Sequence, residues 1–120
     1  MTLPSPDHIR RFIVESIQLW NAGDKDGFMT LYKDMAPGGF RFENPVGTGI
    51  QEGWDALLKM WDDYAAIVQI EILHLIVNGS EAMAMMANKA DVGGRPAIRY
   101  SGETYHFYQD GSFHARYFAE

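Results

Sequence analysis

Residues 39–49 constrain the fold of this chain more than any other stretch. Phe40 and Phe42 alternate with polar neighbours, which predicts a short strand, and Pro45 with two following glycines predicts the turn that ends it. Helical patterns lie on both sides of this strand. A strand that stops at a polar side chain between helices can aim one group into a pocket, and here that group is Asn44.

Three segments show the spacing of amphipathic helices. The first begins at Pro6, whose fixed φ suits the first helical position, and ends at Gly23. Apolar residues recur at three- and four-residue intervals through it, and the same pattern predicts helices at about residues 25–35 and 53–65.

The second half of the chain predicts β-structure. Strands are expected at about residues 67–77, 81–90, 96–108 and 113–119. Asn78 and Gly79 give a strong hairpin pattern, and residues 91–94 predict a loose turn. Helices followed by an antiparallel meander indicate an α+β fold. We expect one domain over residues 1–120, because this length supports a single hydrophobic core.

Composition excludes several classes of function. The net charge of −6 disfavours nucleic acid and anionic membrane surfaces as partners. There is no cysteine, so thiol chemistry and cysteine-ligated metals are excluded. Residues 1–11 lack the apolar core of a signal peptide, and no apolar run approaches a membrane span, so we expect a cytoplasmic protein. No glycine-rich phosphate loop or converging set of metal ligands is evident, so neither a cofactor nor a metal is expected.

Alternation along the strands suggests which side chains face inward. His74 shares a face with Ile70 and Ile72, where a neutral imidazole could act as a base. A core histidine bonded to a backbone carbonyl is the alternative. Glu103 shares a face with Ser101 and Tyr105, and a carboxyl that faces an apolar cavity needs a reason; the alternative is that this strand is turned the other way. Alternation alone does not decide which face is concave.

The order of elements and several short motifs together resemble a known superfamily. These motifs are Leu19-Trp20-Asn21-Ala22-Gly23-Asp24, Leu31-Tyr32, Phe42-Glu43-Asn44-Pro45-Val46-Gly47 and Phe107 with Asp110-Gly111. The chain resembles the SnoaL-like, nuclear-transport-factor-2-like proteins, and among them the bacterial ketosteroid isomerases. The resemblance implies a cone-shaped, cystatin-like roll, with three helices packed in a strongly curved, mostly antiparallel sheet around an apolar pocket.

The catalytic groups of the isomerases are only partly matched. The aspartate that shuttles the proton corresponds to Asn44, and an amide cannot accept a proton near pH 7. The tyrosine that stabilises the oxyanion corresponds to Ser16, whereas a second tyrosine is kept as Tyr32 and a third corresponds to Trp61. The protonated aspartate of the oxyanion hole corresponds to Glu103, which could donate a hydrogen bond when neutral or serve as the displaced base.

Limonene-type epoxide hydrolases form a second branch of this superfamily, with an asparagine at the position of Asn44. Their acid–base relay aligns with Ala87, Lys89 and Arg116, so the relay is absent, and their neighbouring tyrosine corresponds to Phe42.

Three functions therefore compete. The first is an isomerase or lyase that moves a proton on a small apolar cyclic or aromatic carbonyl or hydroxyl compound. The second is a non-catalytic binder of such ligands, and the third is an epoxide hydrolase. Catalysis is assigned to Glu103, His74, Asn44 and Tyr32, although Asn44 before a proline can also be a simple turn residue. The predicted ligand-binding residues, which can equally be core, are Ser16, Trp20, Phe42, Trp61, Met83, Met85, Ser101 and Tyr105.

The opposite face of the sheet suggests a homodimer. Tyr100, His106, Tyr108 and Tyr117 are expected to lie on the face away from Glu103. Members of the resembled superfamily often dimerise through this outer face, and a run of exposed aromatic residues fits such an interface.

Overall fold

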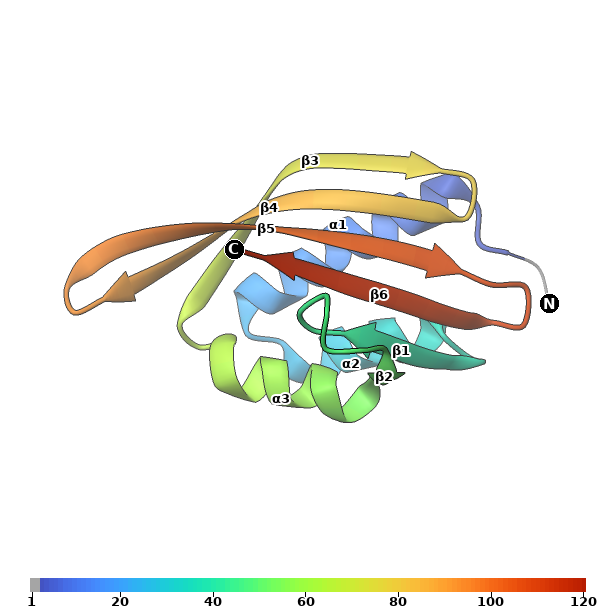
Figure 1. Ribbon diagram of the computed structural model, residues 1–120, viewed down its shortest axis with the longest axis horizontal. Helices are drawn as coiled ribbons and strands as arrows, with labels where there is room; N and C mark the ends of the chain where they lie inside the picture. Colours follow the sequence, from blue (N-terminus) through green and yellow to red (C-terminus); the bar gives the residue numbers. More distant parts are fainter. Residues whose placement is uncertain (1–2) are drawn as a thin grey trace.

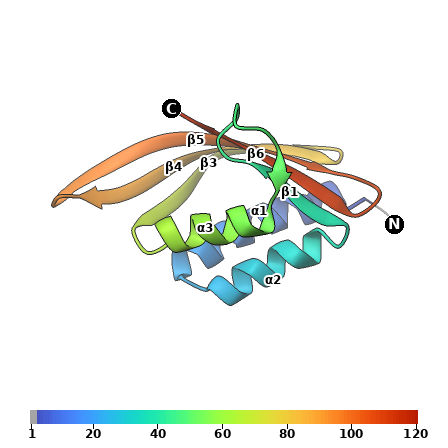
Figure 2. The same ribbon diagram turned by 60° about the horizontal axis from the view of Figure 1, so that its bottom comes forward.

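The computed structural model describes residues 3–120, so the first two residues of the predicted domain lie outside the described part. Three helices pack against the concave face of a curved six-stranded sheet (Figures 1 and 2). The α+β fold predicted above is confirmed. The elements are α1 Pro6–Ala22, α2 Lys25–Met35, β1 Gly39–Glu43, β2 Gln51–Glu52, α3 Trp54–Tyr64, β3 Val68–Asn78, β4 Glu81–Val92, β5 Arg95–Phe107 and β6 Ser112–Ala119.

The ends of α1 follow from local chemistry. The Ser5 hydroxyl accepts a hydrogen bond from the His8 amide at 3.1 Å, which caps the amino end. Gly23 ends the helix in the left-handed region at φ 73°, a conformation that glycine adopts without steric cost. Asp24 then caps α2 through the Gly27 amide. The predicted bounds of α1 and α2 are thus confirmed.

The carboxyl end of α1 is joined to the sheet by two polar side chains. The Asn21 amide group bonds both the N–H and the carbonyl of Ile70, each at 2.8 Å. The Trp20 indole N–H donates to the Val68 carbonyl at 2.9 Å. These bonds replace a missing strand partner for β3, because β3 is an edge strand. They fix the wide end of the cone, where the candidate site lies.

The sheet has the strand order β2-β1-β6-β5-β4-β3. β1 pairs with β6 in parallel, and the other pairs are antiparallel. The short strand β2 was not expected from the sequence, because it spans only Gln51 and Glu52. Parallel pairing brings the end of β1, and hence Asn44, beside the last strand of the chain.

The hairpin of β4 and β5 turns on two glycines and projects beyond the rest of the sheet (Figure 1). Gly93 and Gly94 have φ values of 60° and 80°, as a two-residue hairpin turn requires. The turn pairs Val92 with Arg95, so the loose turn predicted for this region is wrong. This tight turn sets the register of both strands, and pairs Ala84 with Glu103.

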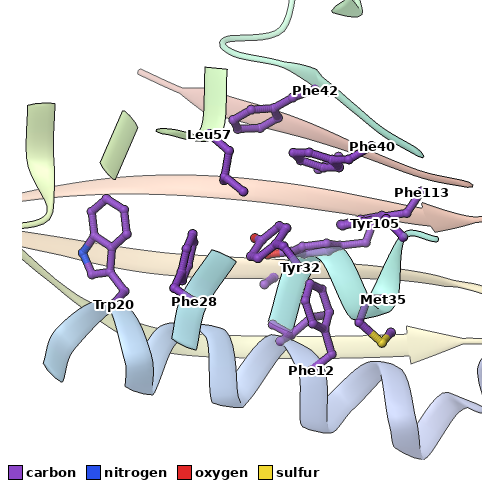
Figure 3. Packing of buried hydrophobic residues seen from close by; sticks show 14 of the residues in the cluster. Phe12, Trp20, Phe28, Tyr32, Met35, Phe40, Phe42, Leu57, Tyr105 and Phe113 are labelled. Atoms are coloured by element: carbon purple, nitrogen blue, oxygen red, sulfur yellow. The ribbon is translucent and has the colours of Figure 1, made fainter. Parts of the chain in front are cut away.

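The core consists mainly of aromatic side chains between the helices and the concave face (Figure 3). Phe12 of α1 contacts Tyr32 of α2 edge to face, with ring centroids 4.9 Å apart. Phe113 of β6 lies 4.9 Å from Phe40 and 4.5 Å from Phe107. Offset and edge contacts of this kind stabilise a core beyond the area that they bury. The helices and the sheet are therefore joined by one continuous aromatic cluster.

Candidate functional site

The wide end of the cone holds a cavity of about 550 Å³ between α3, β3 and the strands β4 to β6. Asn44 and Glu103 both line it, so two of the four predicted catalytic residues meet there. The walls are partly apolar. The lining residues are Trp20, Asn44, Pro45, Ala56, Lys59, Met60, Asp63, Tyr64, Val68, Ile70, Asn88, Arg99, Tyr100, Glu103, Tyr117, Ala119 and Glu120.

Glu103 is the chemically distinctive group of this cavity. It is half-buried on β5, between Ala84 of β4 and Tyr117 of β6. Burial disfavours the charged carboxylate and raises the pKa of Glu103 to about 7, although a hydrogen bond from Tyr105 opposes the rise. The Tyr105 hydroxyl donates to Glu103 Oε2 at 2.6 Å. A carboxyl group with this pKa can both accept and return a proton near neutral pH.

Tyr105 and Tyr32 form the buried support behind Glu103. Tyr105 is fully buried, and burial together with the charge of Glu103 raises its pKa well above the ordinary value. The pKa of Tyr32 is raised for the same two reasons, and a hydrogen bond with Ser16 lowers it. Ser16 also donates to the Ile13 carbonyl at 2.7 Å. Both tyrosines therefore remain neutral hydrogen-bond donors at any working pH of the protein.

Asn44 is positioned by the residue before it. Glu43 is buried and accepts hydrogen bonds from Arg116 at 2.8 Å and from the amides of Gly47 and Gly49 at 2.9 and 3.0 Å. These contacts close the loop after β1 on itself. The loop also bonds β6, because the Val46 amide donates to the Tyr117 carbonyl at 2.8 Å. Asn44 is thus an exposed amide at the cavity, on a loop tied at both ends.

A second set of polar groups lies beside the part of β5 that precedes Glu103. The Asn88 amide donates to the Ser101 hydroxyl at 2.8 Å and to the Arg99 carbonyl at 3.1 Å. Tyr117 lies opposite Glu103, and burial raises its pKa while a hydrogen bond with Ser101 lowers it. The sequence analysis did not assign Asn88, Arg99 or Tyr117 to the cavity.

The other predicted residues divide between core and surface. Trp20 lines the cavity, and Ser101 is buried beside Asn88. Phe42, Trp61, Ser16 and Tyr32 are buried in the packed interior behind the cavity and are not on its wall.

The prediction that His74 lies in the pocket is wrong. A β-bulge falls between Ile72 and His74, so the alternation of β3 changes sides at that point. Ile70 and Ile72 pack against the core before the bulge, and Leu75 and Val77 do so after it. His74 is therefore exposed on the outer face of the sheet and cannot serve as the base of the cavity.

Met83 and Met85 were also placed on the wrong face. They are 54% and 44% exposed, whereas their neighbours Ala82, Ala84 and Met86 are buried. Residues paired across two strands point to the same side of a sheet, and Glu103 pairs with Ala84. If Glu103 faces the cavity, Met83 and Met85 must face outward. The neighbour of Glu103 on β4 is therefore Ala84, a small buried side chain on the inner face.

The outer face also corrects the predicted set of interface aromatics. Tyr117 packs against the core on the same side as Glu103, so its predicted place on the outer face is wrong. Tyr100 is exposed, and the ring of His106 stacks on that of Tyr108 with centroids 4.1 Å apart. Lys89 forms an ion pair with Glu71 on the surface.

Two further searches of residues 3–120 gave negative results. No three His, Asp or Glu side chains of this part of the chain gather as metal ligands would. No helix among these residues is both long and apolar enough to cross a membrane. A second, more open cleft of about 760 Å³ lies at the other end of the sheet, between β1, β2 and the β5–β6 turn, and holds none of the predicted site residues.

Comparison with known families agrees with the geometry. A SnoaL-like domain profile matches residues 10–117, which is nearly the whole chain. The chain belongs to the SnoaL-like family. The predicted resemblance is confirmed at this level. A sequence search among curated proteins finds no relative.

A solved structure shows the same fold. It is SalBIII, described as an epoxide hydrolase/cyclase-like enzyme with a role in pyran ring formation in the polyether salinomycin. The TM-score is 0.72 at 20% sequence identity, over 92% of this chain and 89% of that one. At this identity the likeness establishes the cone fold alone, since one fold hosts many chemistries.

Proposed function

We propose that this SnoaL-like protein is an enzyme that moves a proton on a small apolar cyclic or aromatic carbonyl compound, as an isomerase or lyase without a cofactor. The observation that carries the proposal is the Glu103 carboxyl, which has a pKa of about 7 and lines the same cavity as Asn44. A titratable group with a raised pKa in a cavity is a candidate acid or base. Each remaining group then has a role.

In this proposal Glu103 is the base, whereas the base of the resembled isomerases lies at the position of Asn44. Its carboxylate removes a proton from the carbon beside the carbonyl, and the electron pair of that C–H bond moves to form an enolate. The Asn44 amide donates a hydrogen bond to the oxygen that becomes negative. Glu103 then returns the proton to another carbon, or the enolate expels a leaving group. The hydrogen bond from Tyr105 keeps the Glu103 carboxyl oriented at 2.6 Å.

Hydrogen exchange provides the first experiment. A panel of cyclic and aromatic ketones and enones, including a Δ5-3-ketosteroid, is incubated with the protein in D₂O and followed by NMR for exchange or isomerisation. We expect activity that Glu103→Gln abolishes and that Glu71→Gln, a matched change on the outer face, leaves intact. Glu71 is half-exposed and paired with Lys89, far from any role in the cavity. Equal activity of Glu103→Gln and the wild type would refute the proposal.

A non-catalytic ligand-binding protein is the second candidate. Two observations favour it. Asn44 cannot act as a base, and the exposure of His74 on the outer face removes a second candidate base. In that case the panel shows binding without exchange, and epoxides in the same panel show no hydrolysis. Asn44→Asp then sharpens the result, because a carboxylate at this position is the proton carrier of the resembled isomerases. Activity in the variant alone would indicate a binding protein on an isomerase scaffold.

We also propose that two copies associate through the outer face of the sheet. This face exposes large apolar side chains on four strands, namely Ile76, Met83, Met85, Ile98 and Phe118. Apolar surface of this extent is typical of an interface. Light scattering at micromolar concentration tests it: a dimer is expected, and a monomeric mass contradicts it. Met85→Glu at the centre of the face is expected to give monomers that keep the activity.

A further inference from the structure

Along the inner face of β5 the side chains change from buried and aromatic to exposed and charged toward the mouth of the cavity. Every second residue of this strand points inward: Phe107 and Tyr105 are buried, Glu103 is half-buried, and Ser101 follows beside Asn88. The next inward position is Arg99, which is exposed and lines the same cavity. The series therefore ends in a cation at the rim.

Arg99 is the cation of this cavity that has no partner among residues 3–120. The other lining cation, Lys59, is bonded to Asp63 at 2.8 Å. No carboxylate lies within 4.0 Å of the Arg99 guanidinium in the described part of the chain, whereas four other lysine and arginine side chains there form such pairs. The backbone of Arg99 is held by Asn88, so its side chain starts from a fixed point. A guanidinium presents paired donors that match a carboxylate.

We infer that Arg99 is an anion-recognition group for the ligand, which is an elongated apolar molecule with a carboxylate at one end. This inference deepens the proposed function and rests on it. Arg99 lies four positions before Glu103 on one extended strand, which corresponds to roughly 13 Å. The reacting carbonyl lies at Glu103 and Asn44, the apolar body occupies the cavity, and the carboxylate reaches Arg99 at the mouth.

The rim also carries an opposing charge. Glu120 lines the cavity and forms no ion pair within the described residues. It repels an acid, so its removal is expected to strengthen the binding of acids and not of neutral ligands. This charge gives the experiment a second variant with the opposite sign.

A competition assay tests the inference. The fluorescent neutral probe N-phenyl-1-naphthylamine reports the occupied cavity, and two competitors of equal length displace it: 6-phenylhexanoate and 6-phenyl-1-hexanol. In the wild type we expect the acid to bind about tenfold more tightly than the alcohol, as a charge-assisted hydrogen bond contributes. Arg99→Ala is expected to remove this preference and leave the affinity for the alcohol unchanged. Glu120→Gln is expected to increase the preference.

Arg95→Ala is the matched control. Arg95 lies on the same strand, is exposed, and does not line the cavity. It is expected to keep the wild-type preference, which separates recognition by Arg99 from a change of net charge. Arg99→Lys, which keeps the charge but not the paired donors, is expected to fall between the wild type and Arg99→Ala.

The outcomes separate this inference from the proposed function. If Arg99→Ala still prefers the acid, the inference is wrong, whereas the proposed function, tested by the exchange assay and Glu103→Gln, is unaffected. If neither competitor displaces the probe, the cavity does not take such ligands, and the inference is wrong with it. Loss of acid preference in Arg95→Ala as strongly as in Arg99→Ala also overturns it.

Discussion

Glu43 and Glu103 both lie beside the last strand, yet their surroundings shift their pKa values in opposite directions. Arg116 and Tyr117 are consecutive on β6 and point to opposite faces of the sheet. On the outer face Glu43 pairs with Arg116 at 2.8 Å, and on the inner face Glu103 lies opposite Tyr117. The hydrogen bond from Arg116, with those from two glycine amides, lowers the pKa of Glu43, whereas burial raises the pKa of Glu103 to about 7.

The difference separates a carboxyl with a structural role, Glu43, from the one that we propose as the base, Glu103. Glu43 has its acceptor capacity filled by Arg116, Gly47 and Gly49, so it stays charged and holds the loop that presents Asn44. Glu103 has one donor, Tyr105, and faces a cavity. A carboxyl with unfilled acceptor capacity and a pKa near the working pH is free to exchange a proton.

The largest expected effect comes from removing the exchangeable proton. Glu103→Gln keeps the size of the side chain and is expected to reduce the rate of proton transfer by about a hundredfold or more, as loss of a general base does. The affinity for the substrate should change little, so kcat falls while KM is kept. Steady-state kinetics on the best substrate of the exchange panel measures both. An equal loss in Glu43→Gln, with the loop intact, would erase the distinction between the two carboxyls.

The second prediction is that the two carboxyls give opposite slopes of stability against pH. Between about pH 4.5 and 7 the unfolded chain ionises Glu103 while the folded chain keeps it protonated, so this group lowers the free energy of unfolding as pH rises. The cost is at most about 3 kcal/mol above pH 7, because one pKa unit corresponds to about 1.4 kcal/mol and the half-buried carboxyl retains some solvent. Glu103→Gln should therefore gain stability over the wild type at pH 8 and lose this gain at pH 4.

Glu43 gives the opposite result. Its folded pKa is lowered, so its contribution to stability is present above the unfolded pKa of about 4.5 and disappears as pH falls through the folded value. Glu43→Gln should be less stable than the wild type at pH 7, and the difference should vanish in acid. Urea unfolding of the three proteins across pH 3–8 provides the comparison. If the stability difference from the wild type changed with pH in the same direction for both variants, the opposite pKa shifts of Glu43 and Glu103 would be contradicted.

A smaller effect is expected at the residue that holds Glu103. Tyr105→Phe removes a hydrogen bond that lowers the pKa of Glu103, so this pKa should rise further. Less carboxylate is then present at pH 7, and we expect the rate there to fall severalfold and to recover at higher pH. The pH profile is the decisive measurement, since a merely structural role would reduce the rate at every pH. An unchanged midpoint would show that Tyr105 does not tune Glu103.

The smallest effect is expected outside the cavity. His74→Ala removes the exposed imidazole on the outer face and should change neither activity nor, by more than about 0.5 kcal/mol, stability. Kinetics and urea unfolding in parallel with Glu103→Gln check this. Strong loss of activity in His74→Ala would mean that the outer face contributes to the reaction.

Much of the fold and part of the candidate site could be predicted from the sequence, and particular residues show where prediction failed. Capping residues and apolar spacing gave the bounds of α1 and α2, and Glu103, Ser101 and Tyr105 were correctly placed on one face. Met83 and Met85 were assigned to the pocket although alternation alone left open which face of the sheet is concave. Two consecutive glycines predict a two-residue hairpin, and counting back from it pairs Ala84 with Glu103.

The bulge in β3 was harder to predict. Leu73 is the extra residue of the bulge, and the polar residues change position around it: Gln69 and Glu71 are exposed before it and His74 directly after it. A one-residue shift moves every later side chain to the other face, and His74 moves with them. The change of the polar residues from odd to even positions is a local signal of the bulge, whereas the pairing of His74 with Met85 comes from the fold.

The sequence by itself determined the three helices, the five longer strands, the α+β class, the resemblance to SnoaL-like proteins and the missing base at Asn44, because these depend on local propensity and on residue identity. The tertiary structure decided which carboxyl has a raised pKa in a cavity, and that carboxyl is the base that we propose. Only the fold brings Arg116 to Glu43 across residues distant in the chain, and only the fold leaves Glu103 with one donor inside a cavity. A pKa depends on desolvation and on neighbours in space, and neither is written in the order of the residues.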